Sequence, residues 1–428
     1  MIAIDHLRCS YCGGCVSVCP ENALTLAETR LTVNANCTEC ENCVFACPVG
    51  ALHLPSRANA PRPAMRRQYD VIVVGAGPGG ALAAEVAARA GLATLLIEKR
   101  QEIGSPVRCA EGVGAAQLAE FIAPDPRWIA AEISQLEITT RDRARAPLRA
   151  SGGRGYVLER RVFDRALAER AAQAGAEVRV KTAVTGVLRE AGRVRGVKIR
   201  GAAGDEIAIA APIVIAADGV EAQVGNWAGL DTRLPLSDTM TCAQYVLAGV
   251  EIDPTCTAYT LSQEFAPGGY IWIFPKGQHT ANVGLGVQAD LPRAADPIQL
   301  LTRFIESQPQ LARGAPVTQI VGNVPVALSP ARIVTDGLML IGDAARQVDP
   351  LTGGGIINAM IAGHLAAQVA SEAIRAGDPS ANFLQRYAER WQQTRGQKLE
   401  RNYRLRAKFP AAQRSDERFI QAFALAAK

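Results

Sequence analysis

The sequence of 428 residues lacks the features that mark membrane-spanning, secreted and nucleic-acid-binding proteins. No apolar run reaches the roughly 20 residues that span a bilayer, and the first residues do not read as a signal peptide. We therefore expect a cytoplasmic protein that contacts a membrane at most from its surface. A net charge of +5 is small for this length and gives no indication of nucleic-acid binding. With 48% apolar residues, the composition predicts a globular protein of two to three domains.

Cysteine is the most unevenly distributed residue. Of the 11 cysteines, eight precede residue 48, and the other three are Cys109, Cys242 and Cys256. Residues 9–20 read CSYCGGCVSVCP and residues 37–48 read CTECENCVFACP, so the pattern C-x2-C-x2-C-x3-C-P occurs twice at a spacing of 28. This pattern indicates a metal module in a reducing compartment rather than secreted disulfides.

The duplicated pattern is the signature of a bacterial ferredoxin with two [4Fe-4S] clusters, which carries single electrons. In this signature the fourth cysteine of each run binds the other cluster. The expected ligands are therefore Cys9, Cys12, Cys15 and Cys47 for one cluster, and Cys37, Cys40, Cys43 and Cys19 for the other. Structural zinc is the alternative, although zinc sites are rarely built from duplicated four-cysteine runs that end in proline. The Pro-, Ala- and Arg-rich segment that follows predicts an extended linker.

Residues 69–100, YDVIVVGAGPGGALAAEVAARAGLATLLIEKR, have the pattern of a dinucleotide-binding βαβ unit. The apolar run 71–74 predicts a strand, the Ala-rich segment 81–90 predicts a helix, and 93–97 predicts a second strand. A Gly-rich turn without a ligand is the alternative. The flanking strands, the helix and the acid that ends the unit favour the nucleotide site.

Each glycine of this turn has a physical reason. Gly75 allows the tight turn, Gly77 lets the backbone approach a pyrophosphate, and Gly80 lets the helix pack closely on the strand. The helix N-terminus offers free N–H groups and a positive dipole end to the phosphates. Glu98 can accept hydrogen bonds from a ribose.

Two later segments continue the nucleotide-binding pattern. IVIAADG, residues 213–219, predicts another parallel strand of the same sheet. The strand predicted over 338–341 runs into Gly342-Asp343, and a glycine turn at 353–355 opens a helix at Ile356. Such a turn can aim a second helix N-terminus at the cofactor. Asp343 is placed to accept a hydrogen bond from a ribityl hydroxyl; a helix-capping aspartate is the alternative.

An aromatic strand is predicted in PGGYIWIFPKG, residues 267–277. Its alternation places Tyr270, Trp272 and Phe274 on one strand face. Only 5% of the chain is aromatic, so three aromatic residues at this spacing are not expected by chance. A core strand and the aromatic wall of a binding pocket both fit, and periodicity does not separate them.

Other positions leave two interpretations open. Cys109 is either a small buried thiol or part of a site loop with its neighbours Arg108 and Glu111. Arg160, near the start of a predicted helix, is either a surface arginine or a contact to the phosphates or ribityl chain of a flavin. The basic helical segment 383–409 is either a solvated helix face or a surface attracted to an anionic membrane.

From residue 69 to residue 391 the sequence resembles the geranylgeranyl reductase family of flavoproteins, within the group built like para-hydroxybenzoate hydroxylase. The most specific parts are GSPVRCAEG (104–112) and PGGYIWIFP (267–275). The second is similar to the family motif P-x-x-Y-x-W-x-F-P, which lines the cavity for the prenyl chain. In one departure, the Asp-Gly motif at Asp218 is followed by Val-Glu-Ala, where relatives often have serine in place of Ala222. The N-terminal cysteine module is another departure, because many family members lack it.

The resemblance implies the following roles. Gly79 and Glu98 bind the ADP half of FAD, Val184 meets the adenine, and Arg160 contacts the cofactor. Cys109, Ala110 and Gly112 lie beside the flavin, Asp343 binds the ribityl chain, and Gly355 with Ile356 lies under the isoalloxazine. The full set of expected cofactor-binding residues is Gly75, Gly77, Gly79, Gly80, Glu98, Lys99, Cys109, Ala110, Gly112, Arg160, Val184, Gly342, Asp343, Gly354, Gly355 and Ile356, and the expected catalytic residues are Cys109, Tyr270 and Trp272.

The expected fold is therefore of the α/β class in several modules. A ferredoxin-like two-cluster domain (1–55) and a linker (56–68) precede a discontinuous Rossmann-type FAD-binding domain (69–110, 152–235 and 320–380). An antiparallel β-sheet domain for the substrate (111–151 and 236–319) is inserted into it, and basic helices (381–428) end the chain.

The expected function is an FAD-dependent reductase that saturates C=C bonds of a geranylgeranyl or polyprenyl chain on a lipid, quinone or chlorophyll-type substrate. Reduced FAD supplies hydride from N5 and a proton completes the addition. The chain shows no second strand–GxGxxG–helix unit for NAD(P)H, which fits a flavin reloaded by the fused clusters from an upstream low-potential donor. One alternative is a protein that passes electrons to membrane quinone. A flavin monooxygenase is a further alternative, although it would leave the clusters without a use.

Overall fold

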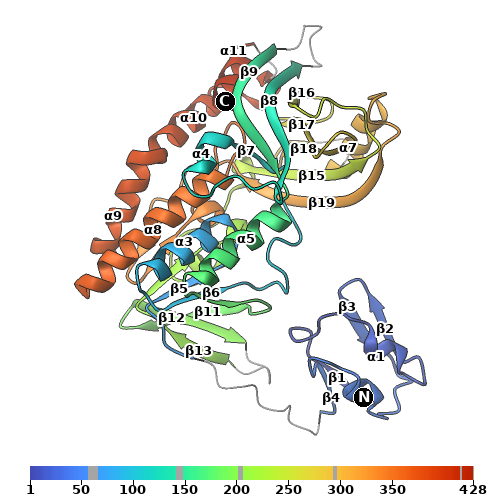
Figure 1. Ribbon diagram of the computed structural model, residues 1–428, viewed down its shortest axis with the longest axis vertical. Coiled ribbons are helices and arrows are strands. Elements are labelled where there is room, and N and C mark those ends of the chain that lie inside the picture. The colour runs from blue at the N-terminus through green and yellow to red at the C-terminus, as the bar shows by residue number, and fades with distance from the viewer. Residues whose placement is uncertain (56–65, 141–147, 201–205, 293–295, 415–416, 428) are drawn as a thin grey trace.

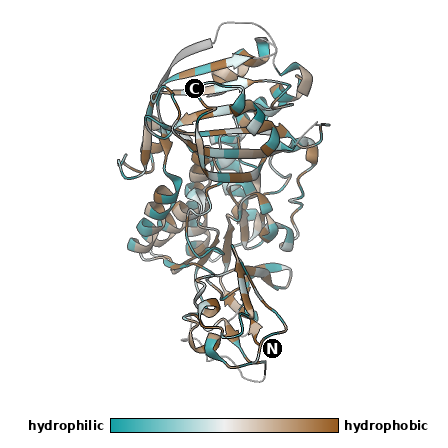
Figure 2. Cartoon of the chain, turned by 90° about the vertical axis from the view of Figure 1, so that its right-hand side faces the viewer, coloured by the Kyte–Doolittle hydropathy of each residue, from teal (hydrophilic) through white to brown (hydrophobic). Residues whose placement is uncertain are grey.

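The computed structural model describes residues 1–55, 66–140, 148–200, 206–292, 296–414 and 417–427. Most of the linker expected over 56–68 lies outside these residues. A small N-terminal module, coloured dark blue in Figure 1, lies beside a larger body of sheets and helices. Figure 2 shows this module at one end of the molecule and a large sheet at the other.

The N-terminal module, residues 1–55, is a pair of similar halves. Each half has one short helix, α1 (Gly14–Ser17) or α2 (Asn42–Phe45), and each helix follows a residue with left-handed φ. The strands pair antiparallel as β1 (Ala3–Ile4) with β4 (Leu52–His53) and β2 (Leu24–Ala27) with β3 (Arg30–Val33). Buried apolar side chains such as Leu24 and Leu52 pack with the cysteines. The expected ferredoxin-like module is confirmed as a structural unit.

A six-stranded sheet forms the centre of the body, in the order β10-β6-β5-β14-β21-β20. All of its strands run parallel except β20, which pairs antiparallel with β21. The residues of β5, β6, β14 and β21 are all buried, as continuous apolar runs predict for a covered parallel sheet. The strands are β5 (Val71–Val74), β6 (Thr94–Ile97), β10 (Glu177–Arg179), β14 (Ile213–Ala216), β20 (Val334–Thr335) and β21 (Leu338–Leu340).

Three helices build the layer beside this sheet, namely α3 (Pro78–Arg89), α5 (Arg160–Gln173) and α8 (Ile356–Ala376). Helix α3 packs against both of the others. It meets α8 at glycines: a Cβ on Gly79 would lie 2.6 Å from the oxygen of Ala359, and one on Gly363 would lie 2.1 Å from the oxygen of Gly79. Gly79 therefore serves helix packing in addition to any contact with a cofactor.

An eight-stranded sheet covers one end of the body, in the order β19-β15-β18-β17-β16-β8-β9-β7. It is antiparallel as expected, except that β16 and β8 run parallel. The strands are β7 (Gly112–Gly114), β8 (Ile129–Thr140), β9 (Leu148–Leu158), β15 (Thr239–Ala248), β16 (Cys256–Leu261), β17 (Tyr270–Pro275), β18 (Thr280–Gln288) and β19 (Ala315–Pro325).

The strand pairing divides the chain differently from the expected domains at two points. β9 continues to Leu158 and β19 ends at Pro325, so residues 152–158 and 320–325 pair in the eight-stranded sheet rather than in the nucleotide-binding part. The physical reason is that β9 leads directly into α5 without a turn, so that no sequence signal separates the two parts there.

The remaining elements lie around these layers. β11 (Val184–Glu190), β12 (Arg193–Arg200) and β13 (Glu206–Ala210) form a third sheet. The other helices are α4 (Ala115–Ala119), α6 (Gln223–Trp227), α7 (Pro297–Glu306), α9 (Ala381–Trp391), α10 (Gln397–Ala407) and α11 (Glu417–Ala427), with a π-helical segment (Gln392–Gly396) between α9 and α10. Among the described helices, none combines the length and the apolar character needed to cross a membrane.

Candidate active site

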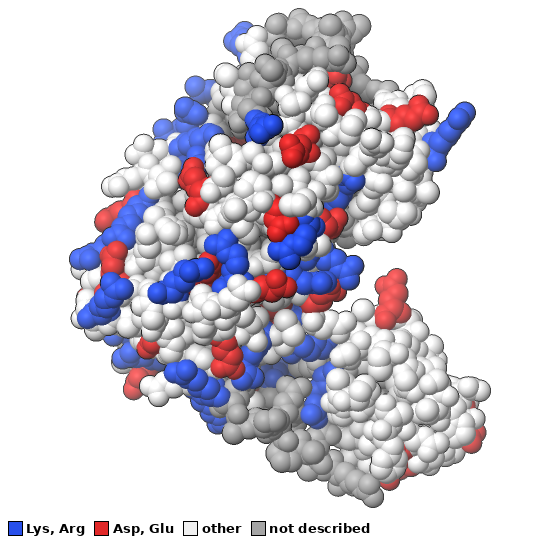
Figure 3. All heavy atoms as spheres, in the orientation of Figure 1, with Lys and Arg blue, Asp and Glu red and all other residues white. Residues whose placement is uncertain are grey.

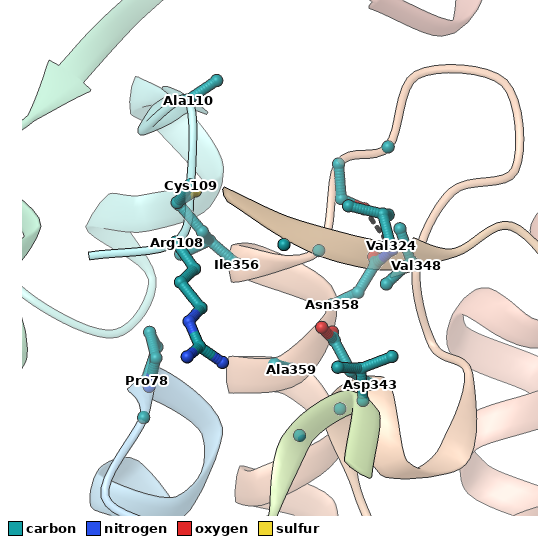
Figure 4. Close-up of a pocket in the computed structure, with 18 of the residues that line it drawn as sticks. Pro78, Arg108, Cys109, Ala110, Val324, Asp343, Val348, Ile356, Asn358 and Ala359 are labelled. Atoms are coloured by element: carbon teal, nitrogen blue, oxygen red, sulfur yellow. Dashed lines mark hydrogen bonds between the residues drawn. The ribbon is translucent and has the colours of Figure 1, made fainter. Parts of the chain in front are cut away.

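One pocket joins the nucleotide-binding turn to the eight-stranded sheet. Its cavity volume is about 690 Å³, and its lining includes the β5–α3 turn, residues 106–114, the pocket face of β17 and the glycine turn before α8. In Figure 4, Arg108, Cys109 and Ile356 lie on one side of this space, whereas Asp343 lies on the other. Segments that the sequence placed in different domains thus share one cavity.

The glycines of the β5–α3 turn have the geometry that their spacing predicts. Gly75 has φ 105°, and a Cβ there would lie 2.2 Å from the oxygen of Ala217. A Cβ on Gly80 would lie 1.9 Å from the oxygen of Gly75, so the helix packs directly on the turn. A Cβ on Gly77 would meet no protein atom within 4 Å. The space beside Gly77 is therefore open to a ligand at the N-terminus of α3.

Residues at the end of the pocket next to β6 already have partners within the protein. Glu98 accepts hydrogen bonds from the N–H of Ala76 at 3.1 Å and of Arg100 at 3.0 Å, which fixes its carboxylate at the end of β6. Lys99 lines the pocket, but its Nζ lies 2.6 Å from Glu221. Val184, the first residue of β11, lines the same end.

Two acidic side chains lie in the middle of the pocket. Burial raises the pKa of Asp343 and that of Asp218 above the ordinary range. Asp343 is not the N-cap residue of either adjoining helix, because those positions are Ile341 and Gly355. Asp218 accepts a hydrogen bond from the N–H of Val224 at 2.9 Å, while its Oδ1 is buried without a partner among the described residues. Both carboxyl groups suit the hydroxyl groups of a ligand.

Glycines and an arginine border Asp343. Gly342 has φ 63° and donates its N–H to Gln347 at 2.7 Å, while Gly354 and Gly355 lead into α8. Arg160 is not a surface residue: its side chain is 15% exposed and pairs with Asp164 at 2.7 Å. That pairing outweighs the cost of burial and raises the pKa of Arg160, so a fixed positive charge lies next to Asp343.

The aromatic strand is part of the pocket wall. Tyr270, Trp272 and Phe274 all line the cavity, as does Tyr259 of the neighbouring strand β16. Ring centroids are 5.6 Å apart for Tyr259 and Tyr270 and 6.0 Å apart for Tyr270 and Trp272, with edge or tilted geometry. Burial raises the pKa of Tyr270 well above its ordinary value, so its hydroxyl is neutral. Because all three aromatic side chains of β17 line the cavity, the structure favours the pocket-wall interpretation of this strand over that of a plain core strand.

Cys109 lies where the nucleotide half meets the aromatic wall. Burial raises the pKa of its thiol, with Arg160 acting in the opposite direction. The backbone oxygen of Cys109 accepts a hydrogen bond from Nε2 of Gln244 at 3.1 Å, and Gln244 in turn accepts one from Trp272 Nε1 at 2.8 Å. Cys109 is therefore held as a neutral thiol beside the pocket.

The eight N-terminal cysteines all lie in the N-terminal module. A small separate pocket is lined by Cys9, Cys12, Cys15 and Cys47. Burial raises the pKa of Cys43 to about 11, and the thiols of Cys15, Cys37 and Cys40 contribute to the shift. Among the described residues, no group of three or more His, Cys, Asp or Glu side chains is arranged to hold one metal ion.

Comparisons with known proteins agree with this geometry. A profile of the 4Fe-4S dicluster domain matches residues 8–51, an FAD binding domain matches residues 70–132, and the geranylgeranyl reductase catalytic domain matches residues 238–324. A digeranylgeranylglycerophospholipid reductase of Methanocella arvoryzae is 48% identical over 345 residues, which are 80% of this chain and 87% of the relative. The chain belongs to the geranylgeranyl reductase family.

Other family members extend the comparison. A digeranylgeranylglycerophospholipid reductase of Methanosphaerula palustris is 49% identical over 360 residues, 83% of this chain and 89% of that protein. The crystal structure of a geranylgeranyl bacteriochlorophyll reductase-like protein from Thermoplasma acidophilum is 42% identical with a TM-score of 0.79, covering 85% of this chain and 92% of that one. The crystal structure confirms the α/β flavoprotein fold, and the profile matches confirm the FAD-binding domain and an iron–sulfur domain.

Sequence reasoning missed several residues of the pocket. Gln244 and Cys242 lie on the pocket face of β15, and burial raises the pKa of Cys242 to about 12. The sequence indicated Arg108 and Glu111 only as neighbours of Cys109 in a possible site loop. Asn282, which is fully buried, hydrogen-bonds the same loop. A polar residue inside an apolar strand pattern is the signal that could have found Gln244 and Asn282.

Proposed function

We propose that this protein is an FAD-dependent reductase that saturates C=C bonds in a polyprenyl chain. The observation that carries this proposal is one continuous pocket, which joins a nucleotide-binding turn to an aromatic wall through Cys109. An elongated apolar chain fits a cavity lined by Tyr259, Tyr270, Trp272 and Phe274. The relatives are named as reductases of a digeranylgeranyl lipid, which supports the same conclusion.

The residues of the pocket fit FAD. The open space beside Gly77 receives the pyrophosphate at the N-terminus of α3, and Glu98 and Val184 flank the adenosine half. Asp343, with its side chain in the pocket and no capping role, receives the ribityl chain. The cofactor-facing set remains the one that the sequence predicts. Gly79 and Lys99 are its weakest members, because each already packs or pairs within the protein.

Bound FAD in its reduced form supplies a hydride, and the addition to an alkene also needs a proton. Cys109 and Tyr270 are the candidates to hold that proton, because both line the pocket and desolvation raises the pKa of each. Tyr270 donates its hydroxyl hydrogen to the backbone oxygen of Thr352, which fixes the ring. Trp272 packs beside it and excludes water, so its role is to shape the site.

The N-terminal module supplies the electrons. Two [4Fe-4S] clusters, with the ligand sets given above, would carry single electrons from an upstream low-potential donor. Residues 1–55 contain 2 Arg and 5 Asp or Glu, a net charge of −3, so the rest of the chain carries +8. Figure 3 shows Lys and Arg gathered on the body. Tyr11, next to Cys12, lies with its ring 5.1 Å from Nζ of Lys181, which precedes the pocket residue Thr182.

A charged head group and a membrane contact fit the rim of the pocket. Arg395 and Lys398 line it from the π-helical segment and α10, and the buried Nε of Arg395 has no partner among the described residues. The relatives are named for a glycerophospholipid substrate, and cationic side chains at this position suit the phosphate of such a head group. Extraction of such a lipid requires contact with a membrane surface, which is why we propose peripheral association.

The test is anaerobic and uses the full-length protein with its cofactors. Dithionite reduces the protein, and geranylgeranyl compounds with phospholipid, diphosphate, quinone and chlorophyll-type head groups are added one at a time. Mass spectrometry should show the mass of added hydrogen pairs on at least one of them. No mass shift with any compound would sink the proposal. Quinone reduction without a shift would indicate an electron-transfer protein, and oxygen consumption coupled to substrate would indicate a monooxygenase.

A further inference from the structure

Glu111 has a backbone conformation that its side chain alone does not explain. Its φ is 76°, in the left-handed region that residues other than glycine rarely adopt. Its side chain is only 3% exposed, so the carboxylate is buried as well. Strain of this kind persists only where the surroundings enforce it, and it concentrates at functional sites. The neighbours of Glu111 therefore show what the strain achieves.

The carboxylate of Glu111 links three separate elements. Oε1 accepts a hydrogen bond from the N–H of Arg160 at 2.8 Å, at the start of α5. Oε2 accepts hydrogen bonds from Lys276 Nζ at 2.6 Å, just after β17, and from Asn282 Nδ2 at 2.6 Å, on β18. Lys276 is itself 9% exposed and also pairs with Glu159 at 2.8 Å. Glu111 thus ties the nucleotide-binding part to the eight-stranded sheet.

The same contacts determine where Cys109 lies. The N–H of Glu111 points at Sγ of Cys109, at 3.2 Å. Asn282, which holds the carboxylate, also donates to the backbone oxygen of Ala110 at 3.1 Å. Gln244 on β15 binds the backbone oxygen of Cys109, and Asn282 on the neighbouring strand β18 binds that of Ala110. Each residue of the loop 109–111 is therefore fixed to the sheet by a buried polar side chain.

We propose that Glu111 is a positioning residue that fixes Cys109 against the flavin-facing side of the pocket through its buried contacts to Lys276 and Asn282. The proposal rests on the proposed function only in giving Cys109 a part in the reaction. The charged and titratable groups that face this thiol are Arg160, Glu111 and Tyr270. A buried pair that loses one partner leaves the other charge uncompensated, so removal of the carboxylate should release the loop.

Three variants separate the parts of this role. Glu111→Gly accepts the left-handed φ without strain but has no carboxylate, and Glu111→Gln keeps the size but removes the charge. The matched control is Glu85→Gln. Glu85 lies on α3, outside the pocket lining, is 2% exposed and pairs at 2.8 Å with Arg170 of α5. All three lose an ion pair made by a buried carboxylate, and only the first two alter the loop.

The readout is the alkylation of Cys109 by iodoacetamide as a function of pH, measured by mass spectrometry on the FAD-loaded protein. We expect Glu111→Gly to be alkylated about tenfold faster than wild type at pH 8, and Glu111→Gln to react from a lower pH, because the negative charge that raises the pKa of the thiol is gone. Turnover should fall about tenfold to a hundredfold at nearly constant KM. Glu85→Gln should lower the melting temperature without either effect.

Wild-type alkylation and turnover in both Glu111 variants would overturn the proposal, as would an effect equal to that of Glu85→Gln. If the wild-type protein reduces no prenyl compound, the proposed function fails. The alkylation profiles would still decide whether Glu111 positions Cys109.

Discussion

The substitution Gly77→Ala tests the nucleotide site most directly. Gly77 has φ −69° and ψ 178°, which alanine adopts without strain, and its Cβ would meet no protein atom within 4 Å. Exchange of a helix N-cap from glycine to alanine costs at most about 1 kcal/mol of stability. A methyl group against the pyrophosphate is an overpacking defect of about 1–3 kcal/mol. We therefore expect FAD to bind roughly 5- to 150-fold more weakly while the apoprotein stays nearly as stable as wild type.

Gly80→Ala, three residues away, is the matched control. Its Cβ would lie 1.9 Å from the backbone oxygen of Gly75, so α3 has to shift and the apoprotein should lose about 3 kcal/mol or more. Urea unfolding of the deflavinated proteins measures the stability, and titration with FAD measures the affinity. Wild-type FAD affinity in Gly77→Ala would refute the placement of the pyrophosphate. Equal destabilisation by both substitutions would refute the open space beside Gly77.

Three further predictions concern other parts of the site. Gly284→Ala would bring a Cβ to 2.4 Å from Cζ2 of Trp272 and should cost about 2–4 kcal/mol in urea unfolding, through overpacking and the indole hydrogen bond that is lost; an unchanged midpoint would contradict the packing. Cys37→Ser should remove roughly half of the bound iron and sulfide, whereas Cys256→Ser, outside the module, should remove none; equal losses would count against the ligand assignment. Because the folded-state pKa of Cys109 is raised, the stability from its neutral thiol is fully present below the ordinary thiol pKa and is lost as pH rises through the folded value. Turnover of the wild-type protein should decline over that same alkaline range. Cys109→Ala should turn over more slowly than wild type and should not show this decline. If the pH profile of Cys109→Ala is identical to that of wild type, Cys109 does not donate the proton.

Local spacing carried most of what could be predicted. The duplicated cysteine runs, the turn at Gly75 and the glycine turn before Ile356 each place their chemistry within a few residues, so the chain itself dictates the geometry. The structure confirms the turn conformations, and the comparisons confirm the FAD-binding and iron–sulfur domains. The alternation at Tyr270 predicted a shared face correctly, but only the pocket showed what that face meets.

The buried polar contacts around Glu111 could not be predicted in this way. Lys276 and Asn282 are 165 and 171 residues away from Glu111 along the chain, and their pairing depends on how the loop 109–111 lies against the eight-stranded sheet. A lysine after an aromatic strand and an asparagine inside an apolar strand each have many local explanations. What identifies their function is that one carboxylate satisfies both, which only the folded chain shows.

The basic C-terminal helices show why charge has to be assigned to individual residues. Their composition suggested either a solvated face or attraction to an anionic membrane. Arg406 and Arg414 are buried, however, and both donate hydrogen bonds to Oε1 of Gln288, at 3.0 Å and 2.5 Å. Burial lowers the pKa of Arg414 to about 10. These two arginines therefore bind the C-terminal segment to β18 instead of facing solvent. Only exposed cations such as Arg401 and Lys398 remain for a membrane or a lipid head group, and Lys398 lines the pocket. Any membrane contact by these helices should therefore depend on the rim of the pocket rather than on the total charge of the segment.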